Sequence, residues 1–242
     1  MPGATAGASL FIFQAGNIVA ASLVLASLLS AVHVAIAVGL NRWSATVRAL
    51  DGAARSDLII QIMWLLTCTP IPVLYGMSMP ELRGRGAEGR WLGTSTACEW
   101  AMLLHVASSL YEAGVYCVYR KPWLYYVHHA IVLYAYGVGL WVGAMHFWGA
   151  WDGLTEASNV NLCILKIGLI LQRGRGSRGE TLNGILLYFS FLVVRVASLP
   201  LWLGLYAAIW FFVRSAKLIP ELLQGSTDAI WACKPNTITA AC

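Results

Sequence analysis

The stretch WLYYVHHAIVLYAYGVGLWV, residues 123–142, decides how the rest of this chain is interpreted. It is apolar and aromatic, and it has the length of about 20 residues that a helix needs to cross the hydrocarbon core of a bilayer. Two adjacent ionisable side chains, His128 and His129, lie inside it. Ionisable groups are costly in hydrocarbon, so a membrane helix that carries them usually turns them toward a protein interior, a cavity or a reaction. We therefore expect the histidine pair to face the interior and to mark the functional site.

The composition of the whole chain is that of a membrane protein. Hydrophobic residues occupy 59% of the 242 positions and charged residues only 11%, whereas ordinary soluble domains have about 25% charged residues. The first apolar run has no basic region before it and is too long for a signal peptide, so we expect it to remain as a helix. Six runs are long enough to span a bilayer, namely 10–38, 57–78, 95–119, 122–144, 148–171 and 182–213. We predict an all-α polytopic membrane protein with little sequence left for a soluble domain.

The last apolar run is the longest and contains Pro200. Its length of about 32 residues corresponds to roughly 48 Å of α-helix. Either piece of a run divided at the proline would be too short to span, so one bent helix is favoured over a seventh span. The predicted organisation is a first transmembrane helix in 1–40, a transmembrane core in 41–213, and a short amphipathic and polar tail in 214–242.

The net charge of +5 comes largely from arginines in the short connections between the apolar runs. Such clusters usually flank membrane helices and contact anionic lipid head groups. Because the chain has no basic soluble domain, nucleic acid is not expected as a partner. Lys and Arg number eight on the side of the first, third and fifth connections and six on the other side. This difference is too small to fix the orientation in the membrane.

Polar side chains of the fifth run share one predicted helical face. Glu156, Asn159, Cys163 and Lys166 are separated by three, four and three residues, which aligns side chains along an α-helix. Lys166 lies near the end of the run, and its long side chain can alternatively extend to the lipid-water interface.

The third and sixth runs carry further ionisable groups. His105, Ser109 and Glu112 lie on one face of the third run, and Arg195 lies in the sixth. Charges at such depths are expected to gather in a common interior, which predicts a helical bundle with a polar-lined cavity. Arg195 alternatively forms a structural ion pair with Glu156 or Glu112.

A histidine beside a carboxylate suits proton-transfer chemistry. The carboxylate orients the imidazole and stabilises its protonated form, so the ring can act as a general base or as a nucleophile toward an activated acyl group. Histidine is also a common metal ligand, but the chain has five histidines with one adjacent pair, and its six cysteines form no CxxC motif. We expect neither a metal site nor a disulfide framework.

The spacing of these residues resembles the TLC-domain family, and within it the ceramide synthase branch. The pattern of that branch has a His-His pair, an acidic residue 27 positions after the second histidine, another acidic residue three further on, and a lysine seven after that. An arginine follows, with a proline five and a tryptophan seven positions later. The resemblance is closest over 122–204 and looser over 40–200. The matching residues here are His128, His129, Glu156, Asn159, Lys166, Arg195, Pro200 and Trp202.

Two positions depart from the family pattern. Val132 stands where the family has threonine in HHxxT, and Asn159 stands where it has a second acidic residue. The loss of that carboxylate removes one candidate acid or base. Two functions are therefore open: an enzyme that resembles ceramide synthase, and a non-catalytic TLC protein that binds lipid or serves as a subunit of a larger membrane complex.

The resemblance implies a fold and a site. The fold is six helices, or seven, in a barrel around a tunnel that admits lipid. The reaction would transfer an acyl chain from acyl-CoA to a sphingoid base or another lipid amine in sphingolipid metabolism. The catalytic group would be His129 as base or nucleophile, with His128 as its partner, Glu156 as the group that orients it, and Asn159 beside it. The expected substrate-binding residues are His105, Glu112, Lys166 and Arg195.

The resemblance also implies the surroundings of the protein. The expected partners are membrane lipids, together with other membrane subunits or further copies of the chain. Acyl-CoA is the expected co-substrate, and no bound cofactor is expected. The implied location is the endoplasmic reticulum membrane, with an organelle inner membrane as the alternative. A transporter or channel is not favoured, because the runs show no inverted repeat and no ring of like charges.

Overall fold

The computed structural model describes residues 15–84, 86–172 and 176–215, and within these ranges every regular element is helical. This confirms the all-α prediction. Contacts along the chain divide it into two compact units, Met1–Val196 and Ala197–Cys242. In the described part, four segments are long and apolar enough to cross a membrane: Asn17–Trp43, Gly52–Gly84, Thr96–Tyr119 and Arg178–Ala197.

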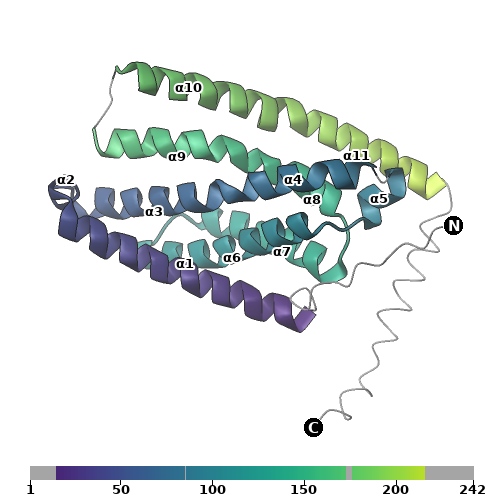
Figure 1. Cartoon of the computed structure of the whole chain (residues 1–242), viewed down its shortest axis with the longest axis horizontal. Coiled ribbons are helices and arrows are strands. Elements are labelled where there is room, and N and C mark those ends of the chain that lie inside the picture. Colours follow the sequence, from purple (N-terminus) through teal and green to yellow (C-terminus); the bar gives the residue numbers. More distant parts are fainter. Residues whose placement is uncertain (1–14, 85, 173–175, 216–242) are drawn as a thin grey trace, which may run out of the picture. The chain divides into compact units, whose positions relative to one another are not determined.

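The second membrane-length segment consists of two consecutive helices. The helix α3 (Gly52–Cys68) begins after Asp51, whose Oδ1 accepts a hydrogen bond of 2.7 Å from the backbone N–H of Ala54, a standard N-cap. The helix α4 (Pro70–Gly84) starts at a proline, which has no N–H for the hydrogen-bond ladder of the preceding helix and fits the first turn of a new one. In Figure 1 the two helices follow one another along nearly the same line. The predicted run 57–78 lies within this pair.

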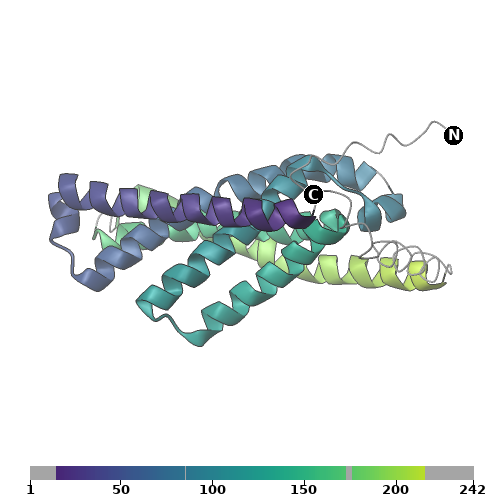
Figure 2. The same ribbon diagram turned by 90° about the horizontal axis from the view of Figure 1, so that it is seen from below.

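The helices α6 (Thr96–Tyr119) and α7 (Trp123–Val142) form an antiparallel hairpin, which Figure 2 shows from below. The turn is short because Arg120 caps α6 in a left-handed conformation with φ of 50° and Pro122 precedes the first turn of α7. α7 coincides with the predicted run 122–144, but it is not among the four membrane-length segments. Its tyrosines and histidines lower its mean hydropathy, although the helix is otherwise apolar.

The fifth predicted run is helical over its whole length and contains one 3₁₀ turn. It consists of α8 (His146–Gly153), the 3₁₀ turn η2 (Leu154–Glu156) and α9 (Ala157–Ile170). Gly153 lies directly before the 3₁₀ turn, and a Cβ on it would lie 2.0 Å from the ring of the fully buried Tyr75. The close approach of α4 therefore requires glycine where a regular helix would prefer another residue.

The sixth predicted run is helical throughout its described part. The helix α10 (Arg178–Phe191) continues into the π-helical segment η3 (Leu192–Ala197) and then into α11 (Ser198–Ser215) of the second unit. Pro200 lies in the first turn of α11, where a missing N–H is tolerated. Of the predicted tail, residues 216–242, with Lys217, Cys233, Lys234 and Cys242, lie outside the described residues.

The core of the first unit lies around α6. This helix packs against α1 (Ala15–Trp43), α4, α7 and α8, while α9 packs between α3 and α10. The short helices α2 (Ala45–Arg48) and α5 (Gly86–Leu92) occupy connections.

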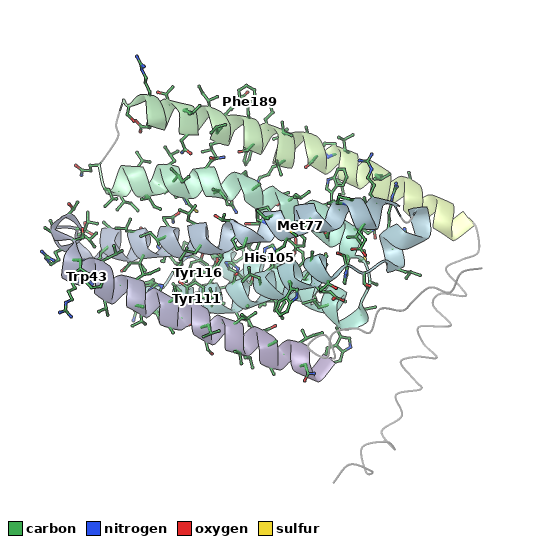
Figure 3. The ribbon with its side chains drawn as sticks, in the orientation of Figure 1. Trp43, Met77, His105, Tyr111, Tyr116 and Phe189 are labelled. Atoms are coloured by element: carbon green, nitrogen blue, oxygen red, sulfur yellow. The ribbon has the colours of Figure 1, made fainter. Side chains whose placement is uncertain are left out.

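The outer helices expose large apolar side chains. Trp43 at the end of α1 is 81% exposed and Phe189 on α10 is 56% exposed; both point outward in Figure 3, whereas Tyr111, Tyr116 and His105 lie in the interior. Such faces suit contact with lipid rather than with water. The described helices thus have the character of a membrane protein.

Candidate functional site

The centre of the candidate site is a buried pair formed by His129 of α7 and Glu112 of α6. Nε2 of His129 lies 3.2 Å from Oε2 of Glu112, and the two side chains are only 8% and 11% exposed. α7 buries a single face, which carries His129, Tyr136 and Leu140 at spacings of seven and four residues. The pair is therefore placed by the packing of that face against α6.

Tyr116 completes the surroundings of the carboxylate. Its hydroxyl donates a hydrogen bond of 3.2 Å to Oε2 of Glu112, one helical turn away, and its ring centroid lies 5.3 Å from that of His129. Glu112 is thus contacted by His129 of α7 and by Tyr116 of its own helix.

The other ring nitrogen of His129, Nδ1, is buried and has no hydrogen-bond partner among the described residues. A carboxylate at Nε2 favours the tautomer that carries its proton there, which leaves a lone pair on Nδ1. This arrangement of a carboxylate on one nitrogen and a free lone pair on the other is the arrangement of a general base.

The two adjacent histidines do not share an environment. His129 is buried, whereas the side chain of His128 is exposed, with its ring edge-on to His129 at 5.1 Å. Successive residues of a helix point about 100° apart, so a helix with one narrow buried face cannot bury both. The expectation that both rings face the interior is corrected to His129 alone.

A second polar group forms around Glu156, at the end of η2. Oε2 of Glu156 accepts hydrogen bonds from Nδ2 of Asn159 at 2.6 Å and from Sγ of Cys68 at 3.6 Å. Asn159 in turn accepts a bond of 3.0 Å from Nη2 of Arg195, whose Nε donates to Oγ of Ser158 at 2.9 Å. Within the described residues, Arg195 therefore reaches Glu156 through an amide and not as a direct ion pair.

The two groups are neighbours. The carboxylate of Glu156 is close enough to Glu112, His129 and His105 for their charges to interact. The residue in hydrogen-bond distance of His129 is nevertheless Glu112, which the sequence suggested as a substrate contact, and not Glu156, which was expected to orient the ring.

His105 belongs to an aromatic cluster beside the pair. Its ring stacks on Tyr136 at 4.4 Å, and Nδ1 lies 3.5 Å from the hydroxyl of Tyr75. Tyr136 donates a bond of 3.0 Å to Oδ2 of Asp152. Tyr75, Tyr136 and Asp152 were not predicted from the sequence as members of the site. Tyr136 could have been found, because it lies two helical turns after His129 and so shares its face.

Lys166 lies apart from Glu156, near the end of α9. Its Nζ lies 5.3 Å from the ring centroid of Trp64 on α3, at a cavity of about 320 Å³. Ten residues of helix separate Lys166 from Glu156, or about 15 Å. The polar residues predicted to share one face of this run thus lie at two separate sites, Glu156 near His129 and Lys166 at the cavity.

No group of three or more His, Cys, Asp or Glu side chains that could hold a metal ion occurs within residues 15–84, 86–172 and 176–215. The four cysteines in these ranges, Cys68, Cys98, Cys117 and Cys163, are free thiols.

These features define a class: a helical membrane protein with a histidine–carboxylate pair buried between two of its helices. The TLC domain matches residues 59–231, more than half of the chain, and the protein belongs to the TLC domain family. This family includes lipid-related membrane proteins. No curated protein and no solved structure matches the chain.

Proposed function

We propose that this TLC protein is a lipid N-acyltransferase that moves an acyl chain from acyl-CoA to a sphingoid base or another lipid amine. The observation that carries the proposal is His129, with Nε2 on the carboxylate of Glu112 and Nδ1 buried and unpartnered among the described residues. A buried base of this kind suits a reaction that needs a neutral amine nucleophile away from water.

In the proposed reaction, the amine nitrogen bonds to the thioester carbonyl carbon and the carbon–sulfur bond breaks. Nδ1 of His129 takes the proton that the amine loses and returns it to the departing thiolate of coenzyme A. Glu112 stabilises the imidazolium that forms between these two transfers. Because Tyr116 fixes Glu112, it acts as a positioning residue.

Asn159 has a positioning role in this proposal. A carboxylate at position 159 would lie beside Glu156, and the two would repel each other unless one were protonated. The amide instead donates to Glu156 and accepts from Arg195. Arg195 and Lys166 are the cationic candidates for contact with a substrate oxygen, and the exposed His128 borders the site.

A non-catalytic role is the second candidate, and two observations favour it. His128 does not join the buried pair, and Asn159 is committed to hydrogen bonds that hold α9 to Arg195. In that case the buried polar groups would hold the helices together, and the protein would bind lipid or serve in a larger membrane complex.

The proposals on topology, location and partners rest on membership of the TLC domain family. We propose six transmembrane helices, with seven as the alternative, arranged as a barrel around a lipid cavity in the endoplasmic reticulum membrane. An organelle inner membrane is the alternative location. Membrane lipids are the proposed partners, with other membrane subunits or further copies of the chain, and nucleic acid is not proposed.

The experiment that tests catalysis uses the purified full chain in lipid nanodiscs with radiolabelled acyl-CoA and a panel of long-chain amines. We expect labelled amide with the natural protein and none above background with His129→Gln. His33→Gln is the matched control, because His33 on α1 also hydrogen-bonds a neighbouring helix, through Tyr111 at 2.7 Å. Equal product from His129→Gln would overturn the role of His129, and no product from the natural protein with any amine would favour the non-catalytic candidate.

A further inference from the structure

A cavity of about 320 Å³ lies where the middle of α3 meets the ends of three other helices. Its lining comes from the middle of α3, the end of α6, the start of α7 and the end of α9, together with the α6–α7 turn. Since these ends gather on one side of the bundle, the cavity lies toward one membrane surface. Its volume equals that of about ten water molecules in the liquid, which suits a small head group.

The lining is divided into a polar and an apolar part. The polar part contains two lysines, an aspartate and a glutamine, one wall is aliphatic and comes from α3 and α9, and three aromatic side chains complete the lining. A pocket of this kind at the edge of a bilayer fits an amphiphile better than a fully soluble molecule. The residues concerned are Asp57, Gln61, Lys121 and Lys166 on the polar part and Ile60, Leu169 and Ile170 on the apolar part.

Gln61 places a buried polar atom beside the cavity. The residue is only 7% exposed, and its Oε1 is buried without a hydrogen-bond partner among the described residues. A buried polar atom without a partner costs free energy. Rotation of the side chain that turns Oε1 toward the cavity would relieve this cost if a bound group there donated a hydrogen bond from a hydroxyl, an amide or an ammonium.

The charge of the cavity favours an anion. Lys121 is paired with Asp57 at 2.7 Å, and this pair is partly exposed. Lys166 lies over the ring of Trp64, and no carboxylate of the described residues lies within ion-pair distance of it. The three charges therefore sum to +1, carried by Lys166.

The cavity adjoins the histidine site. Tyr116 lines the cavity and also donates its hydroxyl to Glu112, the partner of His129. A head group in the cavity would thus be separated from the His129–Glu112 pair by one tyrosine ring.

We propose that this cavity binds the head group of an amphiphile that carries an anionic group for Lys166 and a hydrogen-bond donor for Gln61. The amphiphile is held with its head at the membrane surface and its chain along the aliphatic wall. The inference goes beyond the proposed function and does not depend on it, because binding of the amphiphile is measured without turnover.

The test measures binding of defined probes to the purified full chain in detergent by native mass spectrometry. Lysophosphatidic acid supplies a chain, a phosphate and a free hydroxyl, and monoacylglycerol of the same chain lacks only the phosphate. Glycerol 3-phosphate and inorganic phosphate lack the chain. We expect lysophosphatidic acid to bind at least about tenfold more tightly than each of the other three. Monoacylglycerol lacks the charge-assisted hydrogen bonds, which exceed neutral ones by about this factor, and the two phosphates without a chain lack its apolar contacts.

Two variants probe the cavity. Lys166→Gln should weaken lysophosphatidic acid binding about tenfold, and Gln61→Leu should weaken it severalfold without loss of thermal stability, because an apolar group replaces a buried unpartnered one. Arg178→Gln is the control: it removes one positive charge from the exposed start of α10, on the same side of the bundle and away from the cavity lining.

Each outcome has one meaning. Equal binding of monoacylglycerol, or natural affinity in both Lys166→Gln and Gln61→Leu, would overturn the inference. Equal binding of glycerol 3-phosphate or inorganic phosphate would replace the amphiphile by a soluble phosphate and also overturn it. His129→Gln should keep the binding of lysophosphatidic acid. If lysophosphatidic acid binds but the natural protein makes no amide, the proposed function is wrong and the cavity inference stands. If amide forms but lysophosphatidic acid does not bind, the cavity inference is wrong and the proposed function stands.

Discussion

At the scale of single residues, the adjacent histidines of α7 have different roles because a helix presents them to different surroundings. His129 is the residue with a buried carboxylate partner, and His128 is exposed at 5.1 Å from it. Because the two histidines are adjacent in the sequence, they were expected to act together. In the proposed function only His129 acts as the general base.

This difference predicts unequal effects of the same substitution at the two positions. His129→Gln should lower the single-turnover rate of amide formation by about 100-fold or more, the usual contribution of a general base, whereas His128→Gln should lower it less than about tenfold. The rates are measured with preformed complexes of protein, labelled acyl-CoA and amine. Equal losses at both positions would contradict the assignment of the base to His129 alone.

A second prediction concerns the amide between Glu156 and Arg195. Asn159→Ala removes the donor to Glu156 and the acceptor of Arg195 together, and it should cost about 1–3 kcal/mol of stability because both groups are partly buried. The measurement is thermal unfolding in detergent, followed by the loss of the monodisperse peak on gel filtration.

The control for that change is Asn161→Ala on the same helix, whose side chain makes a long contact of 3.5 Å to Ser190. It should change the unfolding temperature little. If Asn161→Ala were as destabilising as Asn159→Ala, the loss would reflect helix α9 in general and not the link to Arg195.

At the scale of the elements, the sequence predicted which residues share a helix face better than it predicted which helices pack together. The spacing of Glu156, Asn159 and Lys166 and the spacing of His105 and Glu112 indicated which residues share a helix face. Spacing within one helix cannot say which neighbouring helix packs against that face. The resemblance to the TLC family placed Glu156 beside His129, whereas the structure places Glu112 there.

The 3₁₀ turn between α8 and α9 shows the same limit. The run 148–171 is apolar and helical by pattern, so it predicted one regular helix. Beside the turn, Gly153 lies close to the ring of Tyr75, a residue 78 positions away. Local sequence contains no sign of such a contact beyond the glycine itself.

That contact yields a prediction for the packing of α4 against α8. Gly153→Ala would place a methyl group 2.0 Å from the buried ring of Tyr75, so the protein should lose about 1–3 kcal/mol of stability or fail to accumulate. Gly137→Ala on α7 is the matched control, since nothing lies within 4 Å of its Cβ position and alanine favours helix by about 0.5–1 kcal/mol. Thermal unfolding in detergent should move in opposite directions for the two variants.

At the scale of the whole molecule, the apolar runs were sufficient to predict the class. Hydrophobic composition and run length gave an all-helical membrane chain, and the histidine and acidic spacing gave the TLC family. Run length and composition are weaker predictors of the number of membrane spans. The run of α3 and α4 is interrupted before Pro70, the run of α8 and α9 contains a 3₁₀ turn, and the tyrosines and histidines of α7 lower its mean hydropathy.

The helix order of the first unit makes a topological prediction. The end of α1, the start of α3, the α6–α7 turn and the end of α9 should lie on one side of the membrane, and the α5–α6 and α7–α8 connections on the other. Single cysteines placed in a cysteine-free background at Asp51, Arg120 and Gln172 should therefore react alike with an impermeant thiol reagent in sealed, oriented vesicles. Cysteines at Gly93 and Ala144 should show the opposite accessibility.

The same assay decides the number of spans through Ser215, at the end of α11. The helical run from Arg178 begins on the side of Gln172. If the run crosses the membrane once, Ser215→Cys should react like Gly93→Cys, and both ends of the chain's helical part lie on the same side, as six spans require. A Ser215→Cys that reacts like Gln172→Cys would mean that the run crosses twice, with the π-helical segment before Pro200 as the place where it turns back, and the six-span barrel would have to be replaced by seven spans.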